Sequence, residues 1–380
     1  MRVLISCGGT GGHINPGLAI ADIIKKKYPD AEFLFAGTPK GMEAKLVPQA
    51  GYKMETIKVA GFQRQISLEN IGRNIKAAAY LATSGKRAKE IIEGFKPDIA
   101  IGTGGYAAGP VIRKAAKMGI PTAIHEQNAY PGVTNKLLSK EVDYVMLTVK
   151  EALDYMDKSK FEYSVTGLPV RSNINTMSKA AARKKLGLND DFTILSFGGS
   201  LGAGCINETM TEAIKWHTGK KLNINHIHGY GGMGKDTFPQ AMKAAGIPLK
   251  SDRLRITEYI NDMDVCLAAA DLVICRSGAS TLAELEAAGK ASILIPSPIV
   301  AGNHQYHNAM VLGKAGAAVV IEQKDVTSEK IISEIEKLYS DPDRVAIMSH
   351  TAAELHLSDT NERILAVVDK LLEKSKNKGK

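Results

Sequence analysis

The feature that most constrains the fold is a pattern that occurs twice, in which a short apolar run ends abruptly in glycines. The first copy reads LISCGGTGGH from Leu4 to His13, and the second reads ILSFGGSLGA from Ile194 to Ala203. A strand that runs directly into a glycine loop and then a helix is typical of parallel sheets that bind ligands at the carboxyl ends of their strands. The repeat therefore predicts two similar halves, each with its own parallel sheet.

The chain is long enough for two domains. Its 380 residues exceed the size at which a single hydrophobic core usually stops growing, and hydrophobic residues make up 44% of the sequence. Gly167 and Pro169 interrupt the periodic pattern between the halves, as an interdomain hinge would. We expect an N-terminal domain over 1–166, joined by a C-terminal helix over 352–374, and a second domain over 167–350.

Short β-branched runs alternate with helical patterns along the chain, which is typical of parallel sheets covered by helices on both faces. The predicted fold class is α/β, with two Rossmann-like, doubly wound parallel-sheet domains that face each other across a cleft. The strands expected in the first half are Val3–Ser6, Glu32–Ala36, Met54–Val59, Asp98–Gly102, Thr122–His125 and Tyr144–Thr148. Those expected in the second half are Thr193–Phe197, Asn223–His228, Leu254–Thr257, Leu272–Cys275, Ser292–Ile295 and Ala318–Ile321.

Three glycine-rich segments follow expected strands and are suited to binding an anion. They are Gly8–His13, Gly102–Tyr106 and Gly198–Gly202. Glycines let the backbone approach an anion closely, and free amides at the start of a helix stabilise negative charge. Each segment could instead be only a tight turn from strand to helix, so the pattern by itself leaves both interpretations open.

Three other motifs are incomplete. A dinucleotide fingerprint that starts at Gly9 fails, because its last glycine position holds an isoleucine. The P-loop-like run Gly229–Lys235 is followed by Asp236, where a P-loop needs the serine or threonine that holds magnesium. Asp262 and Asp264 imitate a metal-binding DxD pair, but acids in this position commonly begin a helix. The sequence therefore predicts neither a nicotinamide site nor a metal site.

The segment RSGASTLAE carries the most specific chemistry. Its Ser277, Gly278 and Ala279 follow an apolar strand and begin a helix whose free amides can face a diphosphate. Glu284 lies inside that helix, where its carboxylate can accept two hydrogen bonds from the diol of a ribose, although it could also be an ordinary solvated acid. The polar run Asn303–Asn308 offers amides, which suit sugar hydroxyls because they both donate and accept.

Six segments together resemble the MurG family of bacterial glycosyltransferases, and the resemblance covers nearly the whole chain. They are, in order, GGTGGHINPGLAIA, GTGGYAAGP, HEQNAYPG, GGSLGA, RSGASTLAE and NHQYHNA. The resemblance implies a GT-B fold and inverting transfer of N-acetylglucosamine from UDP-N-acetylglucosamine, with no cofactor required. The implied acceptor is the 4-hydroxyl of N-acetylmuramoyl-pentapeptide pyrophosphoryl-undecaprenol, which is converted from lipid I to lipid II in peptidoglycan synthesis.

The resemblance also implies which residues bind the two substrates. The implied donor-binding residues are Thr10, Gly11, Gly12, Asn128, Arg171, Ser200, Ile260, Glu284 and Gln305, and the loop described above adds Ser277, Gly278 and Ala279. Ser200 would face the phosphates, Ile260 would offer its backbone to the uracil, and Gln305 would contact hydroxyls of the sugar. The implied acceptor-binding residues are Gly104, Gly105 and Tyr106.

An inverting transfer needs a base that takes the proton from the acceptor hydroxyl. Imidazole titrates near neutral pH, and His13 lies on the first glycine loop, so it is the first candidate. His13 could alternatively only pin its loop by hydrogen bonding, and Glu126 is the second candidate base. The sequence departs from the family pattern at Leu201 and His304, where many members carry a polar residue and a glutamine.

The basic composition, with a formal net charge of +9, favours an anionic partner. One helical stripe contains the apolar residues Leu68, Ile71, Ile75, Ala79 and Ala82, and nearby in the sequence are the basic residues Arg64, Arg73, Lys76, Lys86 and Arg87. The stripe could dock on an anionic membrane surface, or it could be an internal helix with a solvated basic side. We expect a peripheral protein at the cytoplasmic face of the cell membrane. With 6% aromatic residues, nucleic acid is not an expected partner.

Two other functions fit the same nucleotide. A UDP-N-acetylglucosamine 2-epimerase shares the twin-domain architecture and needs no lipid acceptor. A non-catalytic nucleotide-sugar-binding protein would bind the same ligand without turnover. Incubation with the nucleotide sugar alone separates these alternatives from a transferase, because only an epimerase would convert it to the manno isomer.

Overall fold

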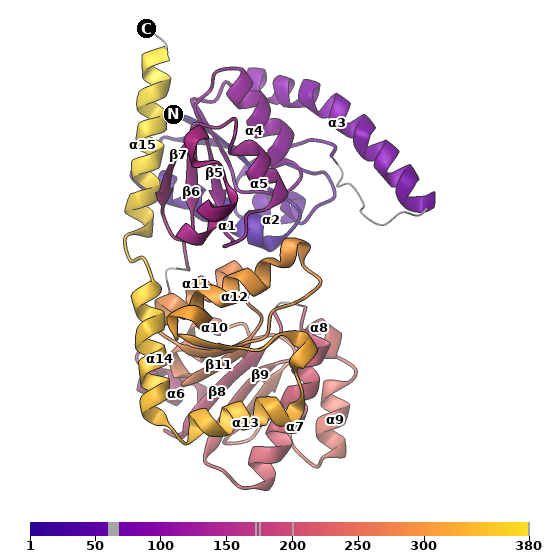
Figure 1. Cartoon of the computed structure of the whole chain (residues 1–380), viewed down its shortest axis with the longest axis vertical. Coiled ribbons are helices and arrows are strands. Elements are labelled where there is room, and N and C mark those ends of the chain that lie inside the picture. The colour runs from indigo at the N-terminus through magenta and orange to yellow at the C-terminus, as the bar shows by residue number, and fades with distance from the viewer. Residues whose placement is uncertain (60–67, 172, 175, 200, 379–380) are drawn as a thin grey trace. The chain divides into compact units, whose positions relative to one another are not determined.

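The computed structural model describes residues 1–59, 68–171, 173–174, 176–199 and 201–378, and for residues 68–79, 81, 82 and 378 it describes the backbone alone. The chain folds into two compact units (Figure 1). The first unit is Met1–Pro169 together with Asp359–Lys380, and the second unit is Val170–Ser358. Each unit contains one parallel sheet with hydrophobic clusters of its own.

The first unit is built on a parallel sheet in the order β3-β2-β1-β4-β5-β6-β7. Its strands are β1 (Arg2–Ser6), β2 (Glu32–Gly37), β3 (Lys53–Thr56), β4 (Ile99–Gly102), β5 (Thr122–Glu126), β6 (Tyr144–Leu147) and β7 (Glu162–Val165). Its helices are α1 (Gly11–Lys27), α2 (Glu43–Gln49), α3 (Leu68–Phe95), α4 (Ala108–Lys117), α5 (Val133–Leu138) and α15 (Thr360–Lys378). The direction in which strands are added reverses between β1 and β4, so the carboxyl ends of these two strands form a topological switch point.

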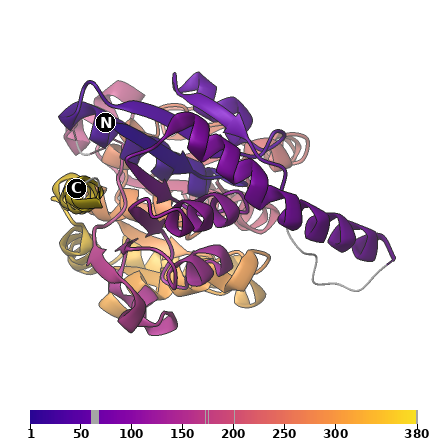
Figure 2. The same cartoon turned by 90° about the horizontal axis from the view of Figure 1, so that it is seen from above.

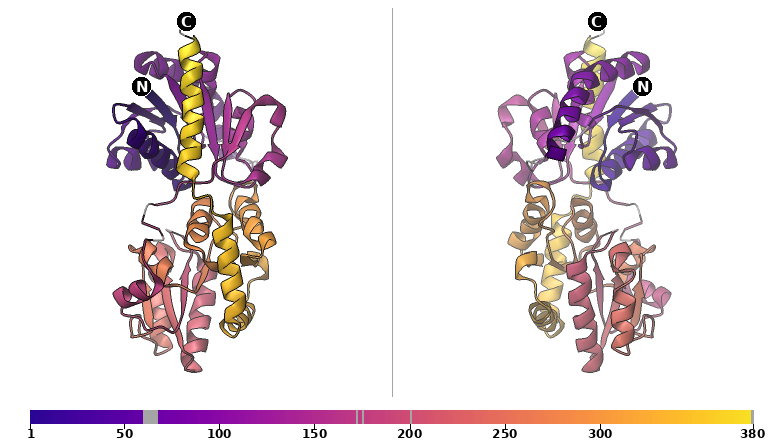
Figure 3. Two further views of the ribbon diagram at one scale, coloured as in Figure 1. Left: turned by 90° about the vertical axis from the view of Figure 1, so that its left-hand side faces the viewer. Right: turned by 90° about the vertical axis from the view of Figure 1, so that its right-hand side faces the viewer.

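Helices cover both faces of this sheet because successive side chains of a strand point to opposite sides. In β1, Val3 and Ile5 pack in the cluster that includes α1 and α15, whereas Leu4 packs in the cluster that includes α3 and α4. Ile364 and Val368 of α15 are completely buried on this face, and Figure 3 shows that helix lying against the strands of the first unit. Figure 2 shows the first part of α3 extending beyond the rest of the unit.

The second unit repeats the design with the strand order β10-β9-β8-β11-β12-β13. Its strands are β8 (Phe192–Phe197), β9 (Ile224–Gly229), β10 (Leu254–Thr257), β11 (Leu272–Cys275), β12 (Ala291–Leu294) and β13 (Ala318–Val320). Its helices are α6 (Lys179–Leu186), α7 (Gly204–Gly219), α8 (Gly231–Gly234), α9 (Phe238–Ala244), α10 (Met263–Ala269), α11 (Ala279–Ala288), α12 (His304–Ala315), α13 (Ser328–Tyr339) and α14 (Pro342–Leu355). The switch point of this sheet lies between β8 and β11.

The predicted α/β class with two doubly wound parallel sheets is confirmed, and each predicted strand has a counterpart in the two sheets. β7 was not predicted from the sequence, because its residues EYSV form an edge of the sheet and are only partly covered. The predicted helix over 352–374 is wrong as one element. Residues up to Leu355 end α14, where Ala352 packs in the second unit, and α15 begins at Thr360 in the first unit.

Candidate active site

The switch point of the first unit brings two of the predicted glycine segments together. They follow β1 and β4, which are neighbours in the sheet. A Cβ atom on Gly105 would overlap the carbonyl group of Gly8, so the two loops can approach this closely only because Gly105 has no side chain. The Thr103 hydroxyl donates a hydrogen bond of 2.7 Å to the backbone oxygen of His13 and holds the second loop on the first turn of α1.

The first turn of α1 is open to an anion. Thr10 is extended at the N-cap position, its side chain makes no capping hydrogen bond, and the turn contains no acidic residue. Because the amides at the start of a helix carry partial positive charge, Gly11 and Gly12 present a backbone suited to phosphate. Thr10, Gly11 and Gly12 thus belong to the loop and helix start whose Gly8 and His13 approach Gly105 and Gly104, and Tyr106 is exposed.

The ring of His13 is oriented by the same loops. Its Nδ1 atom lies 3.1 Å from the backbone oxygen of Gly8. A carbonyl oxygen only accepts, so Nδ1 carries a proton, and in the neutral ring Nε2 is the basic nitrogen. A Cβ atom on Gly104 would lie 3.0 Å from that Nε2 atom, so the basic edge of the ring faces the second glycine loop.

Glu126, the alternative base, is surrounded by donors. Its side chain is 1% exposed. One oxygen accepts hydrogen bonds from the amide and side chain of Asn128 at 2.9 and 3.0 Å, and the other accepts from the Gly132 amide and the Asn135 side chain at 3.0 and 2.8 Å. Glu126 would have to give up one of these contacts to take a proton from a substrate. Its geometry is that of a residue that shapes the loop containing Asn128.

Gln127, which was not among the predicted site residues, joins these loops. It is buried, and its side-chain amide donates hydrogen bonds to the backbone oxygens of Thr103 and His125 at 3.0 and 2.9 Å. The loop after β5 is therefore tied to the loop after β4. The signal that was available is the position of Gln127, a polar residue that directly follows the buried strand β5.

The equivalent switch point in the second unit carries the predicted donor site. The glycine segment after β8 runs into α7. A Cβ atom on Gly231 would overlap the backbone of Gly202, and one on Gly202 would overlap the carbonyl oxygen of Tyr230. The P-loop-like glycines therefore serve backbone packing here. Ser200 lies outside the described residues, and Leu201 is 73% exposed.

Ser277 fixes the loop after β11 to α12. This residue is fully buried, and its hydroxyl donates a hydrogen bond of 2.7 Å to the backbone oxygen of Gln305 in α12. The side chain of Gln305 in turn accepts a hydrogen bond of 2.9 Å from the amide of Ser297. Helix α11 begins at Ala279 after an extended Gly278, with no side-chain cap, so the amides of its first turn are available to an anion.

Arg171 and Glu284 come together from residues far apart in the sequence. The Nε atom of Arg171 donates a hydrogen bond of 2.8 Å to Oε1 of Glu284, whose side chain is 17% exposed. The pair fixes the carboxylate near the middle of α11, where it can accept from a diol. The side chain of Ile260 is buried against Gly229 at the end of β9.

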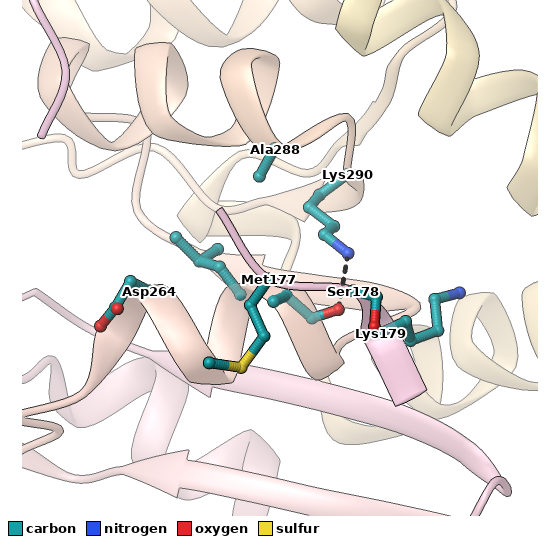
Figure 4. A pocket seen from close by; sticks show the side chains of 8 residues that line it. Met177, Ser178, Lys179, Asp264, Ala288 and Lys290 are labelled. Atoms are coloured by element: carbon teal, nitrogen blue, oxygen red, sulfur yellow. Dashed lines mark hydrogen bonds between the residues drawn. The ribbon is translucent and has the colours of Figure 1, made fainter. Parts of the chain in front are cut away.

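A separate cavity of about 180 Å³ is lined by residues of α10, the end of α11 and the segment Met177–Lys179 (Figure 4). Met177, Asp264 and Lys290 are among its lining residues, which include none of the predicted site residues. Lys290 is buried and donates hydrogen bonds to the backbone oxygens of Ala268 and Ala270 at 3.2 and 2.9 Å. Burial lowers the pKa of its amine to about 8. Since these two carbonyls end α10, Lys290 serves as a cap on that helix.

The predictions on metal binding and on the membrane can be compared with the described residues only in part. Within the described ranges, no group of three or more His, Cys, Asp or Glu side chains could hold a metal ion, and Asp262 is ion-paired with Arg255 at 2.9 Å. No described helix combines the length and apolar character needed to cross a membrane. Arg87 pairs with Glu55 at 2.6 Å. Of the other residues in the predicted docking stripe, only Lys86 has a described side chain.

Comparison with known proteins follows the two halves of the chain. Residues 3–147 match the glycosyltransferase family 28 N-terminal domain, and residues 193–364 match the glycosyltransferase family 28 C-terminal domain. A relative from Acetivibrio thermocellus is named UDP-N-acetylglucosamine--N-acetylmuramyl-(pentapeptide) pyrophosphoryl-undecaprenol N-acetylglucosamine transferase. It is 46% identical to this chain over 98% of the length of both. The chain belongs to the MurG family of glycosyltransferase family 28. The resemblance seen in the sequence is confirmed.

Solved structures agree with membership of the MurG family. The crystal structure of MurG from Acinetobacter baumannii aligns with a TM-score of 0.78 at 26% identity, over 97% of this chain and 99% of that chain. A putative UDP-N-acetylglucosamine 2-epimerase from Listeria monocytogenes aligns with a TM-score of 0.65 at 15% identity, over 98% of this chain and 97% of that chain. The second likeness concerns the fold alone, which is the GT-B arrangement of paired sheets.

Proposed function

We propose that this chain transfers N-acetylglucosamine from UDP-N-acetylglucosamine to the 4-hydroxyl of N-acetylmuramoyl-pentapeptide pyrophosphoryl-undecaprenol, the step from lipid I to lipid II in peptidoglycan synthesis. The observation that carries this proposal is the 46% identity, along almost the full chain, with a transferase named for this reaction. The epimerase alternative has only a likeness of fold at 15% identity, so it is not favoured.

The two units divide the substrates in this proposal. The second unit binds the donor, with Glu284 on the ribose, the backbone of Ile260 at the uracil and the side chain of Gln305 at the sugar. The open first turns of α7 and α11, near Ser200, Gly278 and Ala279, hold the diphosphate. The first unit binds the acceptor through Gly104, Gly105 and Tyr106, while Thr10, Gly11, Gly12 and Asn128 complete the surroundings of the transferred sugar. The open helix starts and the pairing of Arg171 with Glu284 support the proposed phosphate and ribose contacts.

The reaction in this proposal is a single displacement. The acceptor oxygen attacks the anomeric carbon, Nε2 of His13 takes the hydroxyl proton, and the bond from that carbon to the diphosphate breaks with its electron pair on UDP. Attack from the side opposite the leaving group inverts the anomeric centre. The amides that begin α7 and α11 stabilise the charge that develops on the leaving phosphate, so we propose that the reaction needs no cofactor.

The acceptor is a lipid, so we propose that the protein works as a peripheral protein on the cytoplasmic face of the cell membrane. The +9 net charge supports attraction to an anionic surface, which weakens as salt increases. The assay that tests the function should therefore present the acceptor in vesicles that contain anionic lipid, at low and at high salt.

Transfer of label into lipid tests the function directly. With radiolabelled UDP-N-acetylglucosamine and lipid I in such vesicles, we expect label in the lipid fraction and equimolar release of UDP. Conversion of the nucleotide sugar to its manno isomer in the absence of lipid would instead identify an epimerase. Tight binding of the nucleotide sugar with no product from any lipid-linked muramoyl acceptor would identify a binding protein.

A substitution at Glu284 tests the donor site. We expect Glu284→Ala to raise the Kd for UDP by about 10- to 100-fold, because removing a charged acceptor from a ribose diol costs about 1.5–3 kcal/mol. Isothermal titration calorimetry measures this Kd. The matched control is Glu286→Gln on the same helix. Burial raises the pKa of the Glu286 carboxyl to about 8, so at neutral pH it is mostly protonated and an amide replaces it with little change. Equal Kd values for wild type and Glu284→Ala would refute the assignment.

A further inference from the structure

A buried carboxylate lies beneath the first glycine loop. Glu43, the first residue of α2, is completely buried. Its Oε2 atom accepts a hydrogen bond of 3.1 Å from the amide of Gly9. Its Oε1 atom accepts hydrogen bonds from the amide and the hydroxyl of Thr38 at 2.9 and 2.6 Å. The carboxylate therefore bridges the loop after β1 and the loop after β2.

Three glycines make the space that this carboxylate fills. A Cβ atom on Gly8 would lie 2.6 Å from Oε1 of Glu43, and one on Gly37 would lie 2.6 Å from Cγ. A Cβ atom on Gly41 would overlap Oε2. Because the surrounding backbone is this close, the side chain cannot change its conformation unless the loops move. The carboxylate and the first glycine loop are thus mechanically coupled.

The carboxylate is held in its ionised form. Burial pushes the pKa of Glu43 upward, but the hydrogen bonds from Thr38 and Gly9 outweigh burial, and the pKa lies below its ordinary value. Hydrogen bonds to an ionised acceptor are stronger than those between neutral groups. The Gly9 amide is directed at Glu43, so an anion bound to this loop meets the amides that follow, from Gly11 onward. The role of Glu43 is therefore to fix geometry.

The segment that Glu43 grips is the one that orients the candidate base. Nδ1 of His13 lies 3.1 Å from the backbone oxygen of Gly8, and the Gly8 carbonyl belongs to the same peptide unit as the Gly9 amide. We propose that Glu43 is a positioning residue for His13, which it keeps aligned by fixing the peptide between Gly8 and Gly9. This inference rests on the proposed function, because it takes His13 as the base.

The test is Glu43→Gln, assayed by label transfer to lipid I. A glutamine offers one acceptor oxygen, so its NH₂ group must face either Gly9 or Thr38, where the ionised carboxylate accepted. We expect kcat to fall by about 10- to 100-fold, the effect of a small misplacement of a catalytic group, while KM and the Kd for UDP stay within about twofold. The matched control is Thr38→Val, which removes one donor to the same carboxylate but leaves the bond to Gly9. Its kcat is expected to stay within about threefold of wild type.

A second substitution, at a residue outside the first glycine loop, disturbs the same carboxylate. The added methyl group of Gly41→Ala displaces Oε2 without changing the glycine loop itself. We expect the same selective loss of kcat. Binding of UDP reports only on the second unit, so circular dichroism spectra that match wild type are needed in both variants to show that the first unit, which contains both substitutions, remains folded.

A double-mutant cycle separates positioning from general stabilisation. In the His13→Ala background, Glu43→Gln should lower the residual kcat no further, because Glu43 acts through the imidazole. If Glu43→Gln lowers kcat as much in the His13→Ala background as in the wild type, the inference is overturned. A Glu43→Gln enzyme with wild-type kcat would also overturn it. If His13→Ala itself retains wild-type kcat, the assignment of the base fails instead, and the two failures are thereby distinguished.

Discussion

Replacing His13 with alanine is expected to lower kcat for lipid II formation by about 10²- to 10⁴-fold, the usual contribution of a general base. The expectation follows from the ring's orientation. Nδ1 faces the carbonyl of Gly8, so the neutral ring keeps Nε2 as its basic nitrogen, and that edge faces the second glycine loop. The Kd for UDP should stay within about twofold, because the residues proposed to contact the uracil, the ribose and the diphosphate belong to the second unit.

Asparagine at this position separates the two roles that the sequence left open for His13. The amide of His13→Asn can still donate to the Gly8 carbonyl, but it cannot take a proton from a hydroxyl. We therefore expect His13→Asn to be as slow as His13→Ala. Recovery of wild-type kcat in the asparagine variant would mean that His13 only pins its loop. A larger loss in Glu126→Gln than in His13→Ala, with UDP binding intact, would transfer the role of base to Glu126.

The sheets could be predicted because buried parallel strands leave a simple signal. Strands such as Leu272–Cys275 are covered on both faces, so every position is apolar and the run stands out between helical patterns. β7 lacks that signal, since an edge strand can carry exposed residues such as Glu162. The division between α14 and α15 was missed for a different reason. Ala352 and Ile364 belong to similar amphipathic patterns but pack in different units.

In the candidate site, the sequence predicted which residues lie at the carboxyl ends of the strands, but not what their side chains contact. Residues that directly follow strands, such as Thr10 and Ser277, could be placed because the carboxyl ends of parallel strands share one edge of a sheet. The contacts that those side chains make could not be predicted. Ser277 turned out to be buried beneath its loop, where it holds α12 through the Gln305 backbone.

The parts of the candidate site that could not be predicted depend on contacts between residues far apart in the sequence. Arg171 and Glu284 are 113 residues apart, and Glu43 and Gly9 are 34 residues apart. Glu43 reads as an ordinary acid at a helix start, and nothing next to it in the sequence indicates that it is buried. Its environment depends on Gly8 after β1 and on Gly37 and Gly41 at and after the end of β2, two segments that meet only in the folded unit.

The second unit is expected to lose about 6 kcal/mol of unfolding free energy between about pH 7 and pH 5, at about 2 kcal/mol for each of three buried histidines. These residues form a hydrogen-bonded chain with Ser196. His217 lies 3.2 Å from His226, and the Ser196 hydroxyl lies 2.8 Å from both His226 and His228. All three rings are buried, and one nitrogen of His228 has no hydrogen-bond partner among the described residues.

The direction of the pH effect follows from the pKa values. Burial lowers the pKa of His217 to about 4 and that of His228 to about 3, and it lowers the pKa of His226 well below its ordinary value of 6.5. The unfolded chain therefore binds more protons than the folded unit at any pH between these values and about 6.5. The stabilisation is fully present above about pH 6.5 and is lost progressively as the pH falls below it.

The chain contains a single tryptophan, Trp216, which lies in α7 beside His217 and packs against the core of the second unit. Urea titrations followed by its fluorescence therefore report the stability of this unit at each pH. Replacing His217 with glutamine, whose amide can still donate to His226, should reduce the dependence on pH by about a third. The exposed His350 provides the control, because His350→Asn should leave the dependence unchanged. A free energy of unfolding that is the same at both ends of this pH range would contradict the burial of these histidines in their neutral form.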